Sequence, residues 1–510
     1  MRNDSNHSAF ETLTFRLHSV LCQIEQNIIV LPQMKRFSNN QVIMRPKLFL
    51  LFTLLPYFLI AQALDSTLIE ANIEGMANGK IRIVGIFGEQ NFLADSAVAE
   101  GGRFTIRRTS PLSPGFYTFL IPGNKSFSIL VDQHDQRMQL SAKFSDLIGS
   151  LKVTGCANTE QMYRNFKYQM TQDAELGRLG ETLRKSPSTS PEYQAAKARQ
   201  TALLEARKVH LDSIYNEYPD AFFTTYKKSG QNPEFVEYSK PNGDMDTIRQ
   251  LVNYRDKFWD NVDFSDERLL HTPVVANKLK RYMKELTPQQ PDSIIKVSDA
   301  LIRKAMPYKE YFKFFSNWIA LQYENGKTSV MDGEAVYVHI VKNFFTPELA
   351  YWSNEEEIKG LQKHVGEMEA SLIGRKGPDV RANDVNGVPR SIYEMKAPVV
   401  VVFMFSPTCE HCIEEAPDIQ RIYEKYKSRG VDIYSIAVST NEVEWKDFVK
   451  KNGFTFTNVY DPTNRAIYAK YFVDNTPEIY VLNKDRTIVA KNLKATQLET
   501  VLERELKKVN

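Results

Sequence analysis

One stretch predicts more about this fold than any other: Phe405-Ser-Pro-Thr-Cys409-Glu-His-Cys412-Ile-Glu-Glu-Ala-Pro417. The apolar run Val399–Phe405 comes directly before it, and such a run of β-branched and aromatic residues is typical of a strand buried on both faces, as in a parallel sheet. Beyond it, residues on one face of a helical pattern recur at Cys412, Ala416, Ile419 and Tyr423. The two cysteines are therefore expected where a buried strand ends and a helix begins.

This placement predicts a redox site. A thiol at a helix N-terminus faces unpaired backbone N–H groups and the positive end of the helix dipole, which stabilise thiolate over thiol. The two residues between Cys409 and Cys412 let the second cysteine attack a mixed disulfide formed on the first.

The N-terminal region contains a pattern typical of an export signal. Met44-Arg-Pro-Lys47 is basic, Leu48–Ile60 is apolar, and Ala61-Gln-Ala63 resembles a cleavage site, so residues 44–63 are predicted to be a signal peptide. The apolar core is shorter than the roughly 20 residues that span a membrane. Export would place the protein in an oxidising compartment, the periplasm or cell envelope.

Residues 1–43 precede this signal and show no strong pattern. We interpret them as a mis-assigned extension, with Met44 as the true start, and we reject Cys22 as a lipoprotein site because no apolar core precedes it. No later run is long enough to span a membrane, so no span is expected after signal removal. A formal charge of +3 with mixed signs argues against nucleic acid as the main partner.

Residues 66–155 are predicted to form a β-sandwich-like or partly open barrel domain. Short alternating segments are separated by turn signals such as Asn78-Gly79 and Gly101-Gly102, and the strands are expected to be antiparallel. His134 lies in a turn and is interpreted as solvated. Cys156 is interpreted as a small buried residue, with a third redox thiol as the alternative.

Residues 157–370 are predicted to be helical. Leu204, Leu211 and Tyr218 recur every seven positions with Ile214 between them, which favours one apolar helix face. The segment Ser186–Pro191 is expected to separate two helices of a hairpin. An aromatic stripe is interpreted as core and not as a peptide-binding face; it comprises Tyr311, Phe314, Phe315 and Trp318. The remaining histidines lack metal-like spacing, and no metal site is predicted; they are His271, His339 and His364.

Residues 374–510 alternate strands and helices in a recognisable order. After a linker at Gly374–Asp379, a βαβ start is followed by a helix at 464–471, a β-hairpin and a final helix. This order predicts a thioredoxin fold. The predicted fold class is therefore multidomain, with an all-β domain and an α-helical domain before a C-terminal α/β thioredoxin domain.

The motifs of this last domain make the resemblance specific. Residues 374–510 resemble the TlpA/ResA branch of secreted thioredoxin-like thiol–disulfide oxidoreductases, through the following residues: Cys409-x-x-Cys412, Glu415, Pro417 and Thr476-Pro477 before a strand. The three-part architecture also resembles cell-envelope proteins of the Bacteroidetes type.

The resemblance implies a role for each site residue. Cys409 is the expected nucleophile and Cys412 the resolving thiol, and the two form the redox disulfide Cys409–Cys412. Glu415 is expected to exchange a proton with Cys412, because Phe403 stands where ordinary thioredoxins have a buried Asp. A solvated first-turn acid remains the alternative for Glu415.

Three further residues are expected to support the cysteines. His411 resembles the histidine of oxidising members of the superfamily, where it supports the thiolate, although a bystander role is equally open. Pro477 matches the family's cis-proline, and Thr476 would present its backbone to a client peptide. Pro417 is expected to kink the helix. Thr408 replaces a frequent tryptophan, so contacts beside the nucleophile can differ.

The predicted function is an exported thiol–disulfide oxidoreductase that needs no cofactor. Its expected partners are protein thiol or disulfide clients and a membrane or periplasmic electron donor or acceptor. The alternative is a non-enzymatic envelope binding or assembly protein with a structural or vestigial disulfide. A zinc site is weakly supported, because structural zinc usually has four ligands and the sequence has no second CxxC motif or His pair. The redox direction (reductase, oxidase or isomerase) is left open.

Overall fold

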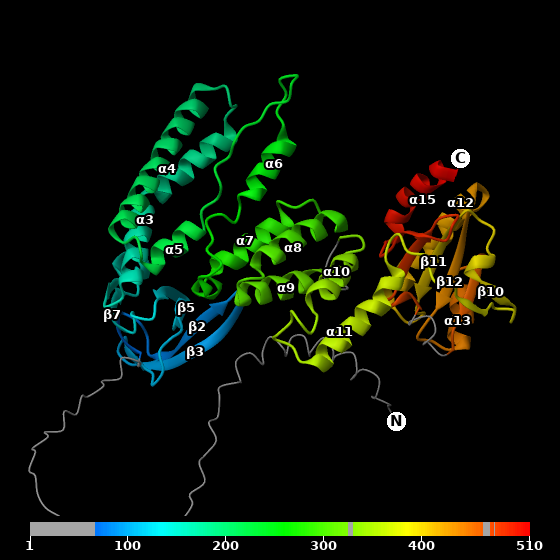
Figure 1. Ribbon diagram of the computed structural model, residues 1–510, viewed down its shortest axis with the longest axis horizontal. Coiled ribbons are helices and arrows are strands. Elements are labelled where there is room, and N and C mark those ends of the chain that lie inside the picture. Colours follow the sequence, from blue (N-terminus) through cyan, green and yellow to red (C-terminus); the bar gives the residue numbers. More distant parts are fainter. Residues whose placement is uncertain (1–66, 325–329, 463–469, 474, 510) are drawn as a thin grey trace, which may run out of the picture.

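The protein is described by a computed structural model that covers residues 67–324, 330–462, 470–473 and 475–509. The predicted signal peptide, the 1–43 extension, Cys22 and all but the last two residues of the helix expected at 464–471 lie outside the described residues. Three parts follow one another along the chain: sheets, then helices, then a mixed α/β part (Figure 1). The predicted fold class is confirmed.

Two four-stranded sheets form the first part. Their strand orders are β4-β1-β7-β8 and β3-β2-β5-β6. Alternating burial along β1, β4 and β7 shows why these residues form strands, since every second side chain enters the core. The strands are β1 Leu68–Glu74, β2 Gly79–Phe87, β3 Gln90–Ala99, β4 Arg103–Arg107, β5 Gly115–Ile121, β6 Lys125–Val131, β7 Arg137–Lys143 and β8 Lys152–Thr154.

The strand pairing corrects one expectation. The sheets are not purely antiparallel, because β1 pairs in parallel with β7 from Leu68 opposite Arg137 onward. Strands β3 and β8 were also not predicted. β3 is mostly exposed or half-buried, and β8 spans only Lys152–Thr154, so neither has a clear apolar alternation. Each is held by its partner, β3 by β2 and β8 by β7.

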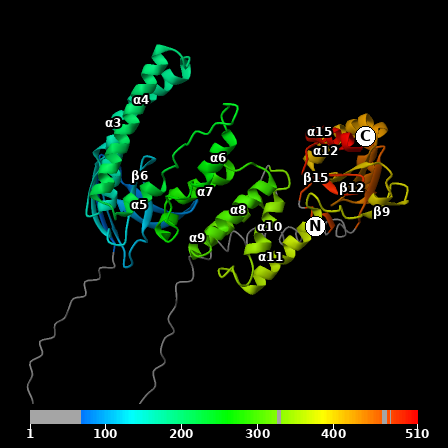
Figure 2. The same cartoon turned by 45° about the horizontal axis from the view of Figure 1, so that its top comes forward.

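The middle part is helical, as predicted. A long hairpin of α3 and α4 projects away from the sheets in both views (Figures 1 and 2). The elements are α2 Leu147–Ser150, α3 Ala157–Lys185, α4 Pro191–Glu217, α5 Phe222–Ser229, α6 Thr247–Asp256, η2 Glu267–His271, α7 Pro273–Lys284, α8 Pro291–Ala305, α9 Lys309–Tyr323, α10 Glu334–Phe344, α11 Glu355–Met368 and η3 Glu369–Ser371. Pro191 begins α4 and the Ser190 side chain caps it, which explains the break after α3.

The apolar face predicted on α4 is partly wrong. Ile214 is fully buried, but Leu204 is 51% exposed and its neighbour Leu203 is the buried residue. Leu203 and Leu204 are about 100° apart around the helix, so the buried stripe that includes Leu203 leaves Leu204 facing solvent. The aromatic stripe on α9, by contrast, is core as predicted: Tyr311, Phe315 and Trp318 are buried and Phe314 is half-buried.

The last part is a five-stranded sheet of order β13-β12-β11-β14-β15. β11 is buried along its whole length, parallel to β12 and antiparallel to β14, so the sheet is mixed. The hairpin β9–β10 at its start was not predicted. The elements are β9 Arg381–Asn383, β10 Pro389–Ser391, η4 Ile392–Glu394, β11 Val399–Phe405, α12 Glu410–Tyr426, η5 Lys427–Arg429, β12 Val431–Ala437, α13 Glu442–Lys451, β13 Thr457–Tyr460, β14 Glu478–Leu482, β15 Ile488–Ala490 and α15 Ala495–Val509.

Alternate residues of β11 face two different cores. Val399, Val401, Phe403 and Phe405 pack with residues of α12, α13 and α15. Val400, Val402 and Met404 pack with the opposite layer, which includes Val380, Ile392 and Tyr471. The continuous apolar run of β11 is therefore required by a sheet covered on both faces.

The segment expected to be a linker is an ordered edge of this sheet. Gly374 N–H donates to Ile488 O over 2.9 Å, Ile488 N–H donates to Arg375 O over 2.8 Å, and Gly377 N–H donates to Arg486 O over 2.8 Å. The segment therefore extends the sheet beyond β15 and is not a free tether.

A buried ion cluster joins the helical part to the α/β part. Lys491 follows β15 and pairs with Glu334, at the start of α10, and its Nζ lies 4.0 Å from Asp332 Oδ1. All three side chains are at most 6% exposed. Asp332 also accepts the Ile373 N–H over 3.0 Å, and Glu334 accepts the Asn492 side-chain amide over 2.9 Å. Burial raises the pKa of Asp332 to about 6, although Lys491 opposes the shift.

Candidate functional site

The two cysteines lie at the junction between the end of β11 and the start of α12. Cys409 is the N-cap residue of α12 and is half-buried, and Cys412 lies in the first turn and is fully buried. The packing of β11 into cores on both faces of the sheet holds the strand end from which α12 begins. Both residues are thiols in this structure.

The surroundings of Cys409 favour its thiolate. Burial raises the pKa of this thiol, but hydrogen bonds from the Cys412 thiol and backbone, from Thr476 and from the His411 backbone together lower the pKa below its ordinary value. The backbone donors, Cys412 and His411, belong to the first turn of α12, where N–H groups have no partner within the helix. Cys409 is therefore the more acidic and more accessible thiol, the properties of an attacking nucleophile.

Cys412 has the opposite character. Burial, followed by its hydrogen bond to Cys409, raises the pKa of this thiol to about 12. It therefore holds its proton at neutral pH while Cys409 is poised to ionise. A pair of thiols whose pKa values are driven apart in this way has two distinct chemical roles.

Thr476 and Pro477 lie beside the two sulfur atoms. The Thr476–Pro477 peptide bond is cis, as the resemblance implied. The Cys409 thiol donates to the Thr476 carbonyl over 3.1 Å, and hydrogen bonding from the Thr476 side chain lowers the pKa of both thiols. Thr476 thus contacts the site through both backbone and side chain.

Glu415 lies one turn beyond Cys412 on α12. Its carboxylate accepts the Ala495 N–H at the start of α15 over 3.2 Å. Burial raises the pKa of Glu415 above its ordinary value, against the opposing effect of that hydrogen bond. Among the described contacts it makes no direct hydrogen bond to Cys412. Its role as a proton carrier stays a prediction, and its contact with α15 carried no sequence signal because it joins distant parts of the chain.

The His411 ring contacts Glu414 and not the Cys409 thiolate that was expected. Its side chain is 79% exposed and Nδ1 lies 3.3 Å from Glu414 Oε2. Its hydrogen bond to Cys409 comes from the backbone N–H and not from the imidazole. The predicted support of the thiolate by the ring stays a prediction, and the Glu414 carboxylate opposes it because it offsets the charge of a protonated ring.

The other sequence candidates stand apart from this site. Cys156 is the N-cap residue of α3 and fully buried, with its thiol 3.3 Å from Leu130 O, and burial raises its pKa to about 12. His339 bonds Asp299 over 2.9 Å. Across the described ranges, no group of three or more His, Cys, Asp or Glu side chains is arranged to hold a metal ion. No helix in those ranges has the length and apolarity needed to cross a membrane.

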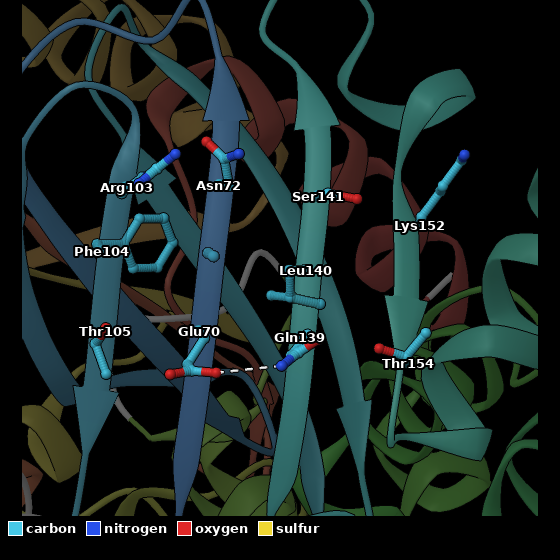
Figure 3. A pocket seen from close by; sticks show the side chains of 11 residues that line it. Glu70, Asn72, Arg103, Phe104, Thr105, Gln139, Leu140, Ser141, Lys152 and Thr154 are labelled. Carbon is cyan, nitrogen blue, oxygen red and sulfur yellow. Dashed lines mark hydrogen bonds between the residues drawn. The ribbon is translucent and has the colours of Figure 1, made fainter.

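A hollow on the outer face of the sheet β4-β1-β7-β8 is a second candidate surface (Figure 3). It has a volume of about 500 Å³, and its lining combines alternate polar residues of the four strands with the buried apolar residues Ala71, Phe104 and Leu140. Glu70 and Gln139 point toward each other and hydrogen bond over 3.3 Å. Exposed alternate residues of a one-sided sheet are polar for solvation alone, so this face implies no chemistry.

Comparisons with known proteins agree with the geometry at the cysteines. Residues 373–491 match the AhpC/TSA family, and residues 249–364 match a domain of unknown function (DUF5106). The thiol-disulfide oxidoreductase ResA of Bacillus cereus is 27% identical over 148 residues, which are 29% of this chain and 84% of that protein. ResA of Bacillus subtilis is 27% identical over 134 residues, 26% of this chain and 74% of that protein.

The chain is similar to ResA over these 134 to 148 residues. The solved structure of a thioredoxin-like protein from Bacteroides caccae covers 54% of this chain and 99% of its own, with 18% identity and a TM-score of 0.44. We call residues 374–510 the ResA-like domain; they include most of the AhpC/TSA match at residues 373–491 and hold Cys409 at the N-cap and Cys412 in the first turn of α12.

The ResA-like domain should show one reactive thiol among its cysteines. We expect Cys409 to be alkylated by iodoacetamide with a midpoint below the ordinary thiol pKa, because its folded-state pKa is lowered. Cys412 should stay unmodified up to about pH 10, because its pKa is raised to about 12. Peptide mass spectrometry across pH resolves each site, and Cys156 is the buried control. Equal alkylation of Cys409 and Cys412 at neutral pH would contradict the split.

Proposed function

We propose that the protein exchanges disulfides with protein clients through Cys409 and Cys412. The observation that carries the proposal is the opposite pKa shifts of two adjoining thiols at a helix N-terminus. The exposed side of Cys409 next to the Thr476 carbonyl offers a client both a nucleophile and a backbone acceptor. No cofactor is needed, because the two cysteines themselves carry the electron pair.

The proposed reduction of a client proceeds in two balanced steps. The Cys409 thiolate attacks one sulfur of the client disulfide, forms a mixed disulfide and releases the other client sulfur as a thiolate. Cys412 then loses its proton and attacks the Cys409 sulfur, which forms the Cys409–Cys412 disulfide and releases the second client thiolate. Two electrons pass from the protein to the client. The reverse sequence oxidises a client dithiol, and a membrane or periplasmic electron donor or acceptor would reset the pair.

Glu415 is the proposed proton acceptor for Cys412. A thiol whose pKa is about 12 attacks slowly at neutral pH unless a base takes its proton during the step. Glu415 is half-buried, its pKa is raised, and it lies one turn from Cys412 on the same helix. A rise in carboxylate pKa brings the group closer to the working pH, which favours proton exchange. A water molecule could bridge the two groups, which do not bond directly.

Export through residues 44–63 belongs to the same proposal. The basic, apolar and small-residue segments of this stretch match a signal peptide, and a periplasmic or envelope location would give the pair access to disulfides. Recovery of a mature N-terminus at Leu64 from an exported preparation would support it. A cell-associated protein that retains residues 44–63 would contradict it.

The deciding experiment is reduction of insulin by dithiothreitol, followed as turbidity. We expect the wild-type protein to accelerate precipitation and the double variant Cys409→Ser/Cys412→Ser to fall to the uncatalysed rate, because serine is neither an effective nucleophile nor a redox group. Cys156→Ser is the matched control and should retain activity. Wild-type protein without activity, with a pair potential below about −300 mV, would instead favour a structural disulfide in a binding protein.

In the same assay, Glu415→Gln separates the proton role from packing. It keeps the side-chain shape and should slow turnover by about 10- to 100-fold, while alkylation of Cys409 stays unchanged. Glu414→Gln, one residue earlier and 72% exposed at its side chain, is the matched control. Equal activity of the two variants would remove Glu415 from the mechanism.

A further inference from the structure

A pocket in the helical part gathers three cationic side chains over an apolar floor. It has a volume of about 400 Å³ and lies where α5 and α7 meet the end of α4. Figure 1 shows α5 between the α3–α4 hairpin and α7, and Figure 2 agrees. The cations are Lys227 from the last turn of α5 and Lys278 and Arg281 from α7. The apolar lining includes Leu211 and Phe258.

The pocket lacks a carboxylate to match these charges. Its other lining residues are apolar, glycine, side-chain amides or the phenol of Tyr226, and none of the described lining residues is acidic. Arg281 has one acidic neighbour, Glu285, at 3.4 Å, but that carboxylate is 68% exposed and lies outside the lining. Two lysines and an arginine thus line a cavity whose own walls supply no counter-charge.

Lys278 is the least solvated of the three cations. The residue is 5% exposed, and its ammonium donates to Gln231 O over 3.0 Å and lies 4.3 Å from the centre of the Phe258 ring. An ammonium has three donors, so the carbonyl satisfies one of them and the ring face offers a weak second partner. Donor capacity therefore remains on an ammonium that is itself largely shielded from water.

Burial without a counter-charge lowers the pKa of both lysines. Burial and then the charge of Arg281 lower the pKa of Lys278 to about 8, and burial lowers the pKa of Lys227. A buried cation is normally paired, because desolvation of an unpaired charge is costly. An anion from outside the chain would pair with these lysines and raise their pKa values again.

We propose that this pocket binds a small organic anion, a carboxylate or phosphate group on an apolar body. The oxyanion would accept hydrogen bonds from Lys227, Lys278 and Arg281, and the apolar body would pack on Phe258 and Leu211. A volume near 400 Å³ suits a ligand of this size. The site is separate from Cys409 and does not depend on the proposed redox function.

Calorimetric titration of the full chain with phenyl phosphate and with benzoate tests this site. We expect saturable binding of at least one probe, with inorganic phosphate weaker and neutral benzyl alcohol inactive. Lys278→Met and Lys227→Met should each weaken binding by about 10- to 100-fold, as expected for loss of a charge-assisted hydrogen bond. Lys284→Met, an exposed change on the same helix α7, is the matched control and should bind like wild type.

A second readout is independent of affinity. At about pH 8.5 an anion that raises the pKa of Lys278 must draw a proton from the buffer, so the binding heat should depend on the buffer's ionisation enthalpy. The other titratable groups that line the pocket are Lys227, Arg281 and Tyr226. Lys278→Met should reduce this proton uptake to what Lys227 contributes, whereas a merely structural lysine would not change it. Equal affinity for inorganic phosphate, binding unchanged in both lysine variants, or no binding at about 10 mM would each overturn the proposal.

Discussion

Cys412→Ser should accumulate the protein in covalent complexes with its clients. The variant keeps the acidic Cys409, so the first attack proceeds and forms a mixed disulfide. It lacks the thiol that would attack the Cys409 sulfur, so the complex cannot resolve from within. Non-reducing electrophoresis of envelope extracts should show bands heavier than the free chain, and these should collapse on addition of dithiothreitol.

Two variants make this result specific to the pair. Cys409→Ser should form no such bands, because the remaining Cys412 is buried and its pKa is raised to about 12. Cys412→Ser combined with Cys156→Ser should trap as well as Cys412→Ser alone, since Cys156 is buried beside Leu130 far along the chain. Trapping through Cys412 and not Cys409 would reverse the assigned roles. Absence of any reducible complex would count against protein clients.

Lys491→Met should destabilise the protein by about 3–5 kcal/mol. The substitution leaves Asp332 and Glu334 as two buried carboxylates without a cation, and loss of one partner from a buried ion pair costs about that much. Chemical denaturation, followed by far-UV circular dichroism, measures the change. Lys484→Met, in the exposed turn between β14 and β15, is the matched control and should cost little.

The loss should depend on pH with a predictable sign. Asp332 has a folded-state pKa of about 6, raised from 3.8, so its contribution to stability is present at low pH and declines as pH rises through about 6. Without Lys491 this pKa rises further, because an attraction that opposed the shift is gone. The difference between wild type and Lys491→Met should therefore be smaller near pH 5 than near pH 8. A difference independent of pH would show that packing, and not charge, holds the interface.

The sequence was sufficient for features that depend on local pattern. The apolar run of β11 and the helical spacing after Cys412 placed both thiols correctly, because a strand–helix junction is encoded by contiguous residues. The aromatic stripe of α9 followed from helical periodicity in the same way. The Thr476-Pro477 motif was recognisable only through the family resemblance.

Features created by contacts between residues distant in the chain could not be predicted from the sequence. Strand β3 has little apolar alternation and exists because β2 pairs with it, and the Glu415 carboxylate meets Ala495 of α15 only after the domain has packed. The parallel pairing of β1 with β7 likewise depends on the arrangement of the whole sheet. The contact of His411 with Glu414 could have been predicted, because a spacing of three residues on a helix is a usable signal for an ion pair.

The hydrogen-bonded segment at Gly374–Gly377 has a consequence for how the nucleophile meets its targets. A flexible linker would let Cys409 take many positions around the helical part, and the range of positions would grow with linker length. Here three backbone bonds and the Lys491 cluster hold the connection. The thiol consequently keeps a fixed orientation relative to the helices. In the proposed function, capture of a client then depends on the orientation in which the client arrives and not on movement of the ResA-like domain.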